Sequence, residues 1–173
     1  MLLLPLVALL LAISPTKTKA HQVLRIQPKA IVYFFVLSDC PLANAFAPEI
    51  QRIDQTYDKH HVQFHLVFED SDLTLENAKK HNQAYKLDLD FRLDPKHQLA
   101  KRLGAAISPE AVVVSPSEQV LYRGRIDNRA VDLGVLRPKT TQHDLRLALD
   151  SILTGKPIAV SRTTAVGCFF SSP

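Results

Sequence analysis

The sequence predicts an α/β fold, built as one mixed β-sheet with helices on both faces. First, residues 29–37 form an unbroken apolar run rich in β-branched and aromatic side chains, which is typical of a central strand buried on both faces. Second, strand-like and helix-like segments alternate along the rest of the chain. Third, the 173 residues are 46% hydrophobic and show no internal repeat or low-complexity linker, so we expect one globular domain.

The first half of the chain supplies a strand, a helix and a second strand. Pro41 follows the apolar run and suits the first turn of a helix, where a missing N–H breaks no hydrogen bond. An apolar face continues this helix to about residue 59. Residues 62–69 then alternate apolar and more polar side chains, which predicts the second strand.

Two helices are expected next. Either Asp72 or Thr74 can cap a helix that runs to about residue 85. Asp94 followed by Pro95 predicts an N-cap and the first turn of a short helix ending near residue 103.

The last part of the domain reads as a hairpin and a helix. Residues 111–115 and 120–125 are strand-like and flank a polar turn that contains Pro116. Thr141 and Asp144 resemble a capping box at the start of a helix that ends near residue 153.

The N-terminal segment, residues 1–20, is predicted to be a signal peptide. Residues 2–13 are almost all aliphatic and uncharged, but a dozen residues fall short of the roughly 20 that span a bilayer. Thr18 and Ala20 place small residues at the −3 and −1 positions of a cleavage site. Because no Lys or Arg precedes the run, an uncleaved anchor through residues 2–14 or a buried helix stays open. The first two alternatives predict an exported protein, periplasmic or extracellular.

The expected organisation is residues 1–20 as the signal or anchor, 21–158 as the domain, and 159–173 as a C-terminal tail. The formal net charge of +4 comes from basic residues that alternate with acidic ones instead of clustering, so we do not expect a nucleic-acid partner.

The chain has two cysteines, too few for a disulfide scaffold or a Cys-only zinc site, and no cofactor or metal is predicted. Cys40 lies where the first strand meets a helix, and the positive end of a helix favours thiolate over thiol. A buried, inert thiol is the alternative. Asp39 adds a negative charge that disfavours the thiolate, which predicts modest reactivity.

The segment 34–49, an apolar strand running into Cys40-Pro41 and a helix with a Pro-Glu pair, resembles the active-site segment of thioredoxin-fold proteins of the redoxin or thiol-specific-antioxidant type. A second segment, 103–116, resembles the part of that fold in which a cis-proline precedes a strand. The resemblance implies a thioredoxin-like fold with Cys40 as the reactive thiol and Pro109 as the cis-proline. It also implies that the Ser108 backbone binds an extended substrate.

At several positions this sequence lacks residues that related enzymes use for catalysis, which limits the reactions that Cys40 can perform. Ala43 stands where dithiol enzymes of the family have their second cysteine. Peroxiredoxins have a threonine and an arginine beside the reactive cysteine, and those positions read Leu37 and Pro109 here. The hydroxyl of Ser38 or the guanidinium of Arg125 could substitute for them.

Cys168 in the tail resembles the resolving cysteine of two-cysteine peroxiredoxins, which attacks the oxidised first cysteine. Two alternatives stay open, namely a permanent structural disulfide with Cys40 and an unpaired or intermolecular thiol.

We therefore expect an exported thiol oxidoreductase that acts on a protein or small-molecule disulfide or on a hydroperoxide, and that is regenerated by an external thiol. The competing hypothesis is a non-catalytic thioredoxin-like binding module with a structural Cys40–Cys168 bridge and a link to copper handling. Against copper, Asn44 replaces the second cysteine of the Cys-x-x-x-Cys motif in the copper-delivery branch of the fold. His60, His61 and His65 cluster at the second strand, and His60 and His61 are expected to be exposed surface residues.

Overall fold

The computed structural model describes residues 27–170. The predicted signal or anchor at residues 1–20 lies outside the described residues and stays a prediction. Within the described part of the chain, no helix combines the length and the apolar character needed to cross a bilayer.

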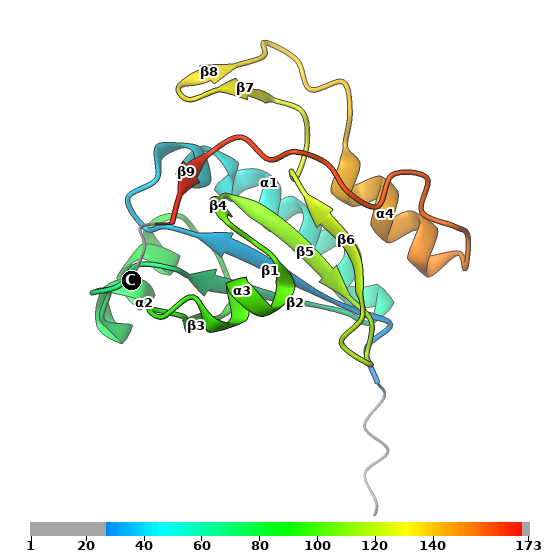
Figure 1. Ribbon diagram of the computed structural model, residues 1–173, viewed down its shortest axis with the longest axis horizontal. Helices are drawn as coiled ribbons and strands as arrows, with labels where there is room; N and C mark the ends of the chain where they lie inside the picture. Colours follow the sequence, from blue (N-terminus) through cyan, green and yellow to red (C-terminus); the bar gives the residue numbers. More distant parts are fainter. Residues whose placement is uncertain (1–26, 171–173) are drawn as a thin grey trace, which may run out of the picture.

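A five-stranded mixed sheet forms the centre of the fold (Figure 1), which confirms the predicted α/β architecture. The strand order is β3-β2-β1-β5-β6; β1 is parallel to β2 and β2 to β3, whereas β5 runs antiparallel to both β1 and β6. The bounds are β1 (Ala30–Val36), β2 (Val62–Phe68), β3 (Asp90–Leu93), β5 (Glu110–Val114) and β6 (Val120–Gly124). The carboxyl end of β1 therefore lies inside the sheet, where the residues that follow it can meet elements on both sides.

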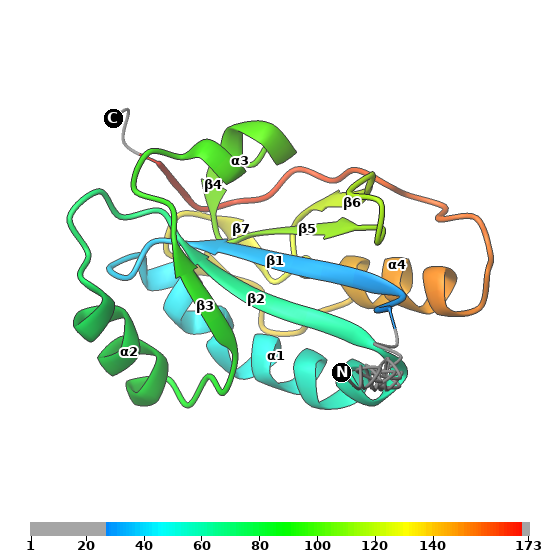
Figure 2. The ribbon, with the colours of Figure 1, turned by 90° about the horizontal axis from the view of Figure 1, so that it is seen from below.

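Helices cover both faces of this sheet, as expected (Figure 2). One face carries α1, α2 and α4, and the opposite face carries the short α3. The side chains of β1 alternate between them, because Phe34 packs with the α1 side and Phe35 packs with the α3 side. The bounds are α1 (Pro41–Tyr57), the 3₁₀ turn η1 (Asp58–His60), α2 (Leu75–Ala84), α3 (Gln98–Leu103) and α4 (Asp144–Leu153).

The helix starts were predicted with mixed success. Of the two caps considered for α2, Thr74 is the one used, and its hydroxyl accepts a hydrogen bond from the backbone N–H of Asn77. The prediction for α4 was wrong, because Thr141 bonds Asn128 instead of capping the helix, and the N-cap is His143.

The start of α3 was also predicted too early. The helix begins at Gln98 instead of Pro95, because His97 has a left-handed backbone with φ of 52°. Asp94 still serves the helix, since its carboxylate accepts hydrogen bonds from the N–H groups of residues 98, 99 and 100 at 2.7–3.0 Å.

Replacing Asp94 with alanine should therefore lower the free energy of unfolding by about 2 kcal/mol, because three buried or half-buried N–H groups lose their acceptor. Urea denaturation followed by circular dichroism measures this. The exposed Asp72→Ala is the matched control, and an equal loss in both variants would contradict the assignment.

Among residues 27–170, five strands were not predicted from the sequence. The edge strand β3 has only four residues, and its side chains are alternately exposed, so its apolar signal is weak. The other four form two small sheets: β4 (Ile107–Ser108) with β9 (Cys168–Phe169), and β7 (Ala130–Asp132) with β8 (Val135–Leu136). The β4–β9 pair brings the end of the described chain back across the sheet to the region after β1 (Figure 1).

Candidate thiol redox site

Cys40 is the N-cap residue of α1, and Pro41 occupies the first helical turn as expected. The Cys40 side chain is 1% exposed. Its backbone N–H donates to the carbonyl of Leu37 at 3.2 Å, which closes the turn between β1 and the helix. The sulfur therefore lies near the unpaired N–H groups at the start of a 17-residue helix.

The turn before Cys40 is held from two neighbouring elements. The carboxylate of Asp70, which follows β2, accepts hydrogen bonds from both the backbone N–H and the hydroxyl of Ser38. Asn44 on α1 donates its side-chain amide to the Ser38 carbonyl at 3.1 Å, and His81 on α2 contacts the Asn44 amide oxygen at 2.8 Å. Because the Ser38 hydroxyl bonds Asp70 at 2.7 Å, we no longer expect it to assist the thiolate.

Sequence reasoning missed Asp70. The available signal was an acidic residue just past the end of a strand parallel to β1, because parallel strands end at the same edge of a sheet.

Ser108 and Pro109 lie directly against the cysteine. The peptide bond between them is cis, as the family resemblance implied. The Ser108 hydroxyl accepts a hydrogen bond from the Leu37 N–H at 2.7 Å, and the Ser108 carbonyl lies 3.2 Å from the Cys40 Sγ. Ser108 thus contacts both the turn and the sulfur.

The tail brings Cys168 to the same point. Strand β9 pairs antiparallel with β4, and Cys168 lies opposite Ser108 in this register. The two Sγ atoms are 2.7 Å apart, and both cysteines are free thiols. The preceding Gly167 permits this approach, since a Cβ there would overlap the Ser108 carbonyl oxygen and lie 2.6 Å from its carbon.

The two sulfurs differ in acidity. Burial raises the pKa of Cys40, but hydrogen bonds from the Cys168 side chain, the Ala43 backbone and Ser108 outweigh it, so the pKa ends below its ordinary value. Burial, followed by the contact with Cys40, raises the pKa of Cys168 to about 12. The charge of Asp39 also contributes to the raised pKa of Cys168. As the pH rises, Cys40 therefore ionises before Cys168.

Arg125 does not supply a positive charge to this thiolate. Its guanidinium donates to Asp144 at 2.8 Å and to Gln142 at 2.6 Å, at the start of α4. The expectation that it substitutes for the peroxiredoxin arginine is therefore wrong for this conformation.

A buried acid–base pair lies beneath the end of the tail. Glu69 is fully buried, and its carboxylate contacts the His97 Nδ1 at 2.6 Å. Burial raises the pKa of Glu69 to about 7. The ring of Phe170 stacks on the His97 ring, with centroids 5.6 Å apart and planes 16° apart. Nothing in the sequence pattern pointed to this contact.

The histidines near β2 do not converge on one point. His60 and His61 are exposed, as expected, whereas His65 is half-buried and stacks on Tyr33 at 5.6 Å. Burial lowers the pKa of His65.

Among the described residues, one group of three potential metal ligands comes together, formed by Glu49, Asp127 and His143. The donor set does not suit a cation. Glu49 already accepts from Arg146 at 2.8 Å, and Asp127 accepts from Arg129 at 2.9 Å. The group is better described as part of an ion-pair network joining α1, α4 and the segment after β6.

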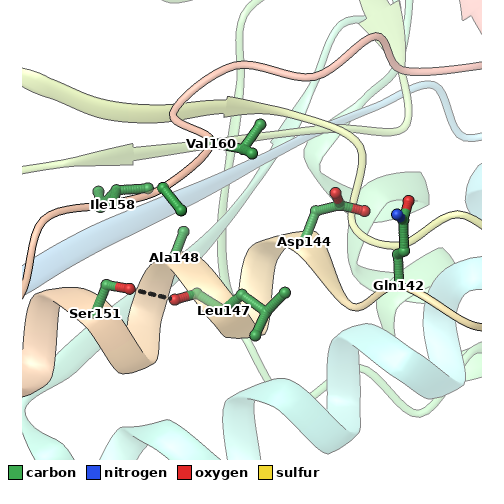
Figure 3. Close-up of a pocket in the computed structure, with 8 residues that line it drawn as sticks. Gln142, Asp144, Leu147, Ala148, Ser151, Ile158 and Val160 are labelled. Atoms are coloured by element: carbon green, nitrogen blue, oxygen red, sulfur yellow. Dashed lines mark hydrogen bonds between the residues drawn. The ribbon is translucent and has the colours of Figure 1, made fainter.

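A small cavity of about 240 Å³ lies elsewhere, between α4 and residues 158–160 (Figure 3). Its polar groups already have partners, because Ser151 donates to the Leu147 carbonyl and Asp144 binds Arg125. The cavity therefore presents no unpaired polar group that could act in catalysis.

A cysteine at the start of a helix, beside a cis-proline and next to a mixed sheet with helices on both faces, defines a thioredoxin-fold protein. The sequence model of the Thioredoxin-like family matches residues 28–120, more than half of the chain, and the chain belongs to this family. A comparison with curated proteins gives no match.

Solved structures show the same fold. A hypothetical protein from Sinorhizobium meliloti is 21% identical with a TM-score of 0.75, over 85% of this chain and 81% of that one. An uncharacterised conserved protein from Geobacillus kaustophilus is 23% identical with a TM-score of 0.73, over 83% and 77%. A thiol-disulfide oxidoreductase from Bacteroides fragilis is 20% identical with a TM-score of 0.50, over 59% and 76%.

Proposed function

We propose that this protein is a thiol-disulfide oxidoreductase in which Cys40 is the attacking thiolate and Cys168 the resolving thiol. The observation that carries the proposal is the 2.7 Å separation of the two Sγ atoms, combined with opposite shifts of their pKa values. The sulfur that ionises first becomes the nucleophile. The other sulfur keeps its proton and lies within reach for the second step.

The reaction proceeds in two exchanges. The Cys40 thiolate attacks one sulfur of a substrate disulfide, which forms a mixed disulfide and releases the first substrate thiolate. Cys168 gives up its proton and attacks the Cys40 sulfur, which forms the Cys40–Cys168 disulfide and releases the second thiolate. The two released thiolates take up protons, so the substrate gains two electrons and the cysteine pair loses them. An external dithiol then reduces the pair.

The surrounding residues position these sulfurs. Pro41 begins the helix whose N-terminus stabilises the thiolate, and the Ser108 backbone aligns the strand that carries Cys168. Pro109 directs the chain from β4 into β5, so that Ser108 faces Cys40.

Disulfides fit this site better than hydroperoxides. The peroxiredoxin threonine and arginine are replaced by Leu37 and Pro109, and the two candidate substitutes, Ser38 and Arg125, bond other groups. The site also lacks a copper ligand at position 44, because the side-chain amide of Asn44 is hydrogen-bonded to Ser38 and His81. The remaining alternative is a binding module in which the two cysteines form a permanent bridge.

We further propose that the protein acts outside the cytoplasm, with residues 1–20 as the export signal or anchor, 21–158 as the catalytic domain and 159–173 as the tail. Support comes from the apolar N-terminal run and from chemistry that suits an oxidising compartment.

The test is turnover of a small aromatic disulfide by the reduced protein with a dithiol as reductant. Cys40→Ser should abolish turnover. Cys168→Ser should allow one attack and then accumulate a mixed disulfide on Cys40, visible as a mass increase. Equal rates for wild type and Cys40→Ser would refute catalysis, and hydroperoxide in a parallel assay should be reduced more slowly than the disulfide.

A further inference from the structure

The described part of the C-terminal tail, residues 159–170, forms backbone hydrogen bonds with the body of the protein at two separate places. It leaves α4, crosses beside β6 and ends on β4, as the two ribbon views show (Figures 1 and 2). The first contact involves Ser161–Thr163 and the second involves Gly167–Phe170. The two contacts differ in how firmly they hold the chain.

The first contact is a firm anchor. The backbone of Arg123 on β6 exchanges hydrogen bonds with Ser161 and Thr163, both at 3.0 Å. The Thr163 hydroxyl also bonds the fully buried Tyr122 at 2.9 Å and accepts from the Arg125 N–H. Gly124 lies directly beneath Thr163, where a Cβ would lie 2.8 Å from the Thr163 nitrogen.

The second contact is small. It consists of a two-residue strand on a two-residue strand, one further hydrogen bond of 3.3 Å from Phe170 to Ala106, the thiol pair and the Phe170 ring on His97. The half-buried side chains of Cys168 and Phe170 also pack against the core. Phe169 is 75% exposed, so it adds little apolar burial. A contact of this size opens at low free energy compared with the core.

Between the two contacts the tail borders a groove of about 450 Å³, whose other lining residues follow α3 or lie on β4, β5 and β6. Thr164 is exposed at this groove, whereas Ala165 is buried and Val166 packs partly against the core. The tail can therefore leave β4 by rotation near Thr164 while the anchor at Thr163 stays in place, and this movement exposes the two small apolar side chains that follow.

The docked strand presents a cysteine to Cys40 in the geometry that a second chain would need. Cys168 lies opposite Ser108, antiparallel to β4, with its sulfur on Cys40. An external polypeptide that brought a cysteine to Cys40 as an extended strand would use the same backbone groups. Tail and external strand cannot occupy this edge together.

We propose that the segment Gly167–Phe170 is a tethered, displaceable occupant of the β4 edge, and that a polypeptide partner binds by exchanging places with it. The partner is an extended chain with a glycine directly before its cysteine and an aromatic residue two positions after it. The glycine is required because a side chain there would overlap the Ser108 carbonyl, and the aromatic residue takes the place of Phe170 on His97.

This inference rests on the proposed function, because the partner is a substrate only if the protein is an oxidoreductase. The test measures binding alone and contains no redox step. The probe is a fluorescent peptide with the sequence of residues 161–170 in which serine replaces the cysteine. The proteins are full-length Cys168→Ser, in which the tail is docked, and Cys168→Ser with Gly167→Ala, in which it is released. Binding is measured by fluorescence anisotropy.

A docked tail competes at an effective concentration in the millimolar range, so the peptide should bind the released variant at least about ten-fold more tightly than the docked one. A second peptide with alanine in place of its glycine should not bind. Cys168→Ser with Phe170→Ala provides an independent release of the tail if the glycine variant folds poorly.

Equal affinity for docked and released proteins, absence of binding to both released variants, or equal binding of the alanine peptide would each overturn the proposal. None of these results depends on turnover. Loss of disulfide reductase activity with intact strand exchange would refute the proposed function alone.

Discussion

Replacing Gly167 with alanine should slow formation of the Cys40–Cys168 disulfide by about 100-fold, because β9 can no longer reach its place beside β4. The added methyl group would overlap the Ser108 carbonyl oxygen and approach the Ile107 side chain at 2.9 Å. The backbone carbonyl cannot yield, since Ser108 is fully buried and its hydroxyl is bonded to Leu37. The sulfur of Cys168 is then displaced, and attack between two sulfurs tolerates little misplacement.

The measurement is the rate at which the reduced protein loses both thiols to a low concentration of a small disulfide, with the bridged product identified by mass. Gly134→Ala is the control for a glycine-to-alanine change away from the site. Gly134 lies in the exposed turn between β7 and β8, where a Cβ meets nothing within 4 Å, so the strain that its φ of 75° places on alanine stays local to that turn. A bridge that forms equally fast in Gly167→Ala and in the control would show that the tail reaches Cys40 by another route.

The pH titration of the reduced protein should show that Cys40 ionises first, with a lowered pKa, and that Cys168 ionises only at strongly alkaline pH. Absorbance at 240 nm reports thiolate directly and does not require a reagent to enter the buried site. Burial raises the pKa of Cys40, but the first ionisation lies below its ordinary value because Cys168, Ala43 and Ser108 donate hydrogen bonds to the Cys40 sulfur. The second ionisation, that of Cys168, occurs at higher pH because the pKa of Cys168 is raised to about 12.

Two single-cysteine variants assign the ionisations. In Cys168→Ala the Cys40 transition should move to higher pH because the largest lowering hydrogen bond is removed. In Cys40→Ser the Cys168 transition should move down from about 12, because the neighbouring thiolate is gone. Subtracting the double-serine variant removes the tyrosine signal. Unchanged transitions in both variants would contradict the coupling.

The lowered pKa of Cys40 also predicts how the free energy of unfolding changes with pH. The pKa of Cys40 is lower in the folded than in the unfolded protein, so its ionisation stabilises the fold above the unfolded thiol pKa. That contribution is lost as the pH falls through the folded pKa. The stability of reduced wild type relative to Cys40→Ser should therefore rise with pH across this window.

Local patterns predicted most of the regular structure. The apolar run that became β1 and Pro41 at the start of α1 were recognised because burial on both faces and the missing proline N–H leave direct marks in the sequence. The short strands β4 and β9 leave no such mark, since a strand of two residues has no periodicity. The late start of α3 was missed because it depends on the left-handed backbone of His97.

The sequence by itself determined the fold class and the position of Cys40 at a helix start, and its resemblance to a known family pointed to Ser108 and Pro109. The first two depend on residues that are neighbours along the chain. Only the tertiary structure decided that Cys168 meets Cys40, across 128 residues, and that Asp70 holds the turn before it. The contact between the cysteines depends on the register of β4 and β9 and on the close approach of Gly167 to the Ser108 carbonyl. Both arise from the packing of segments that are distant in the sequence.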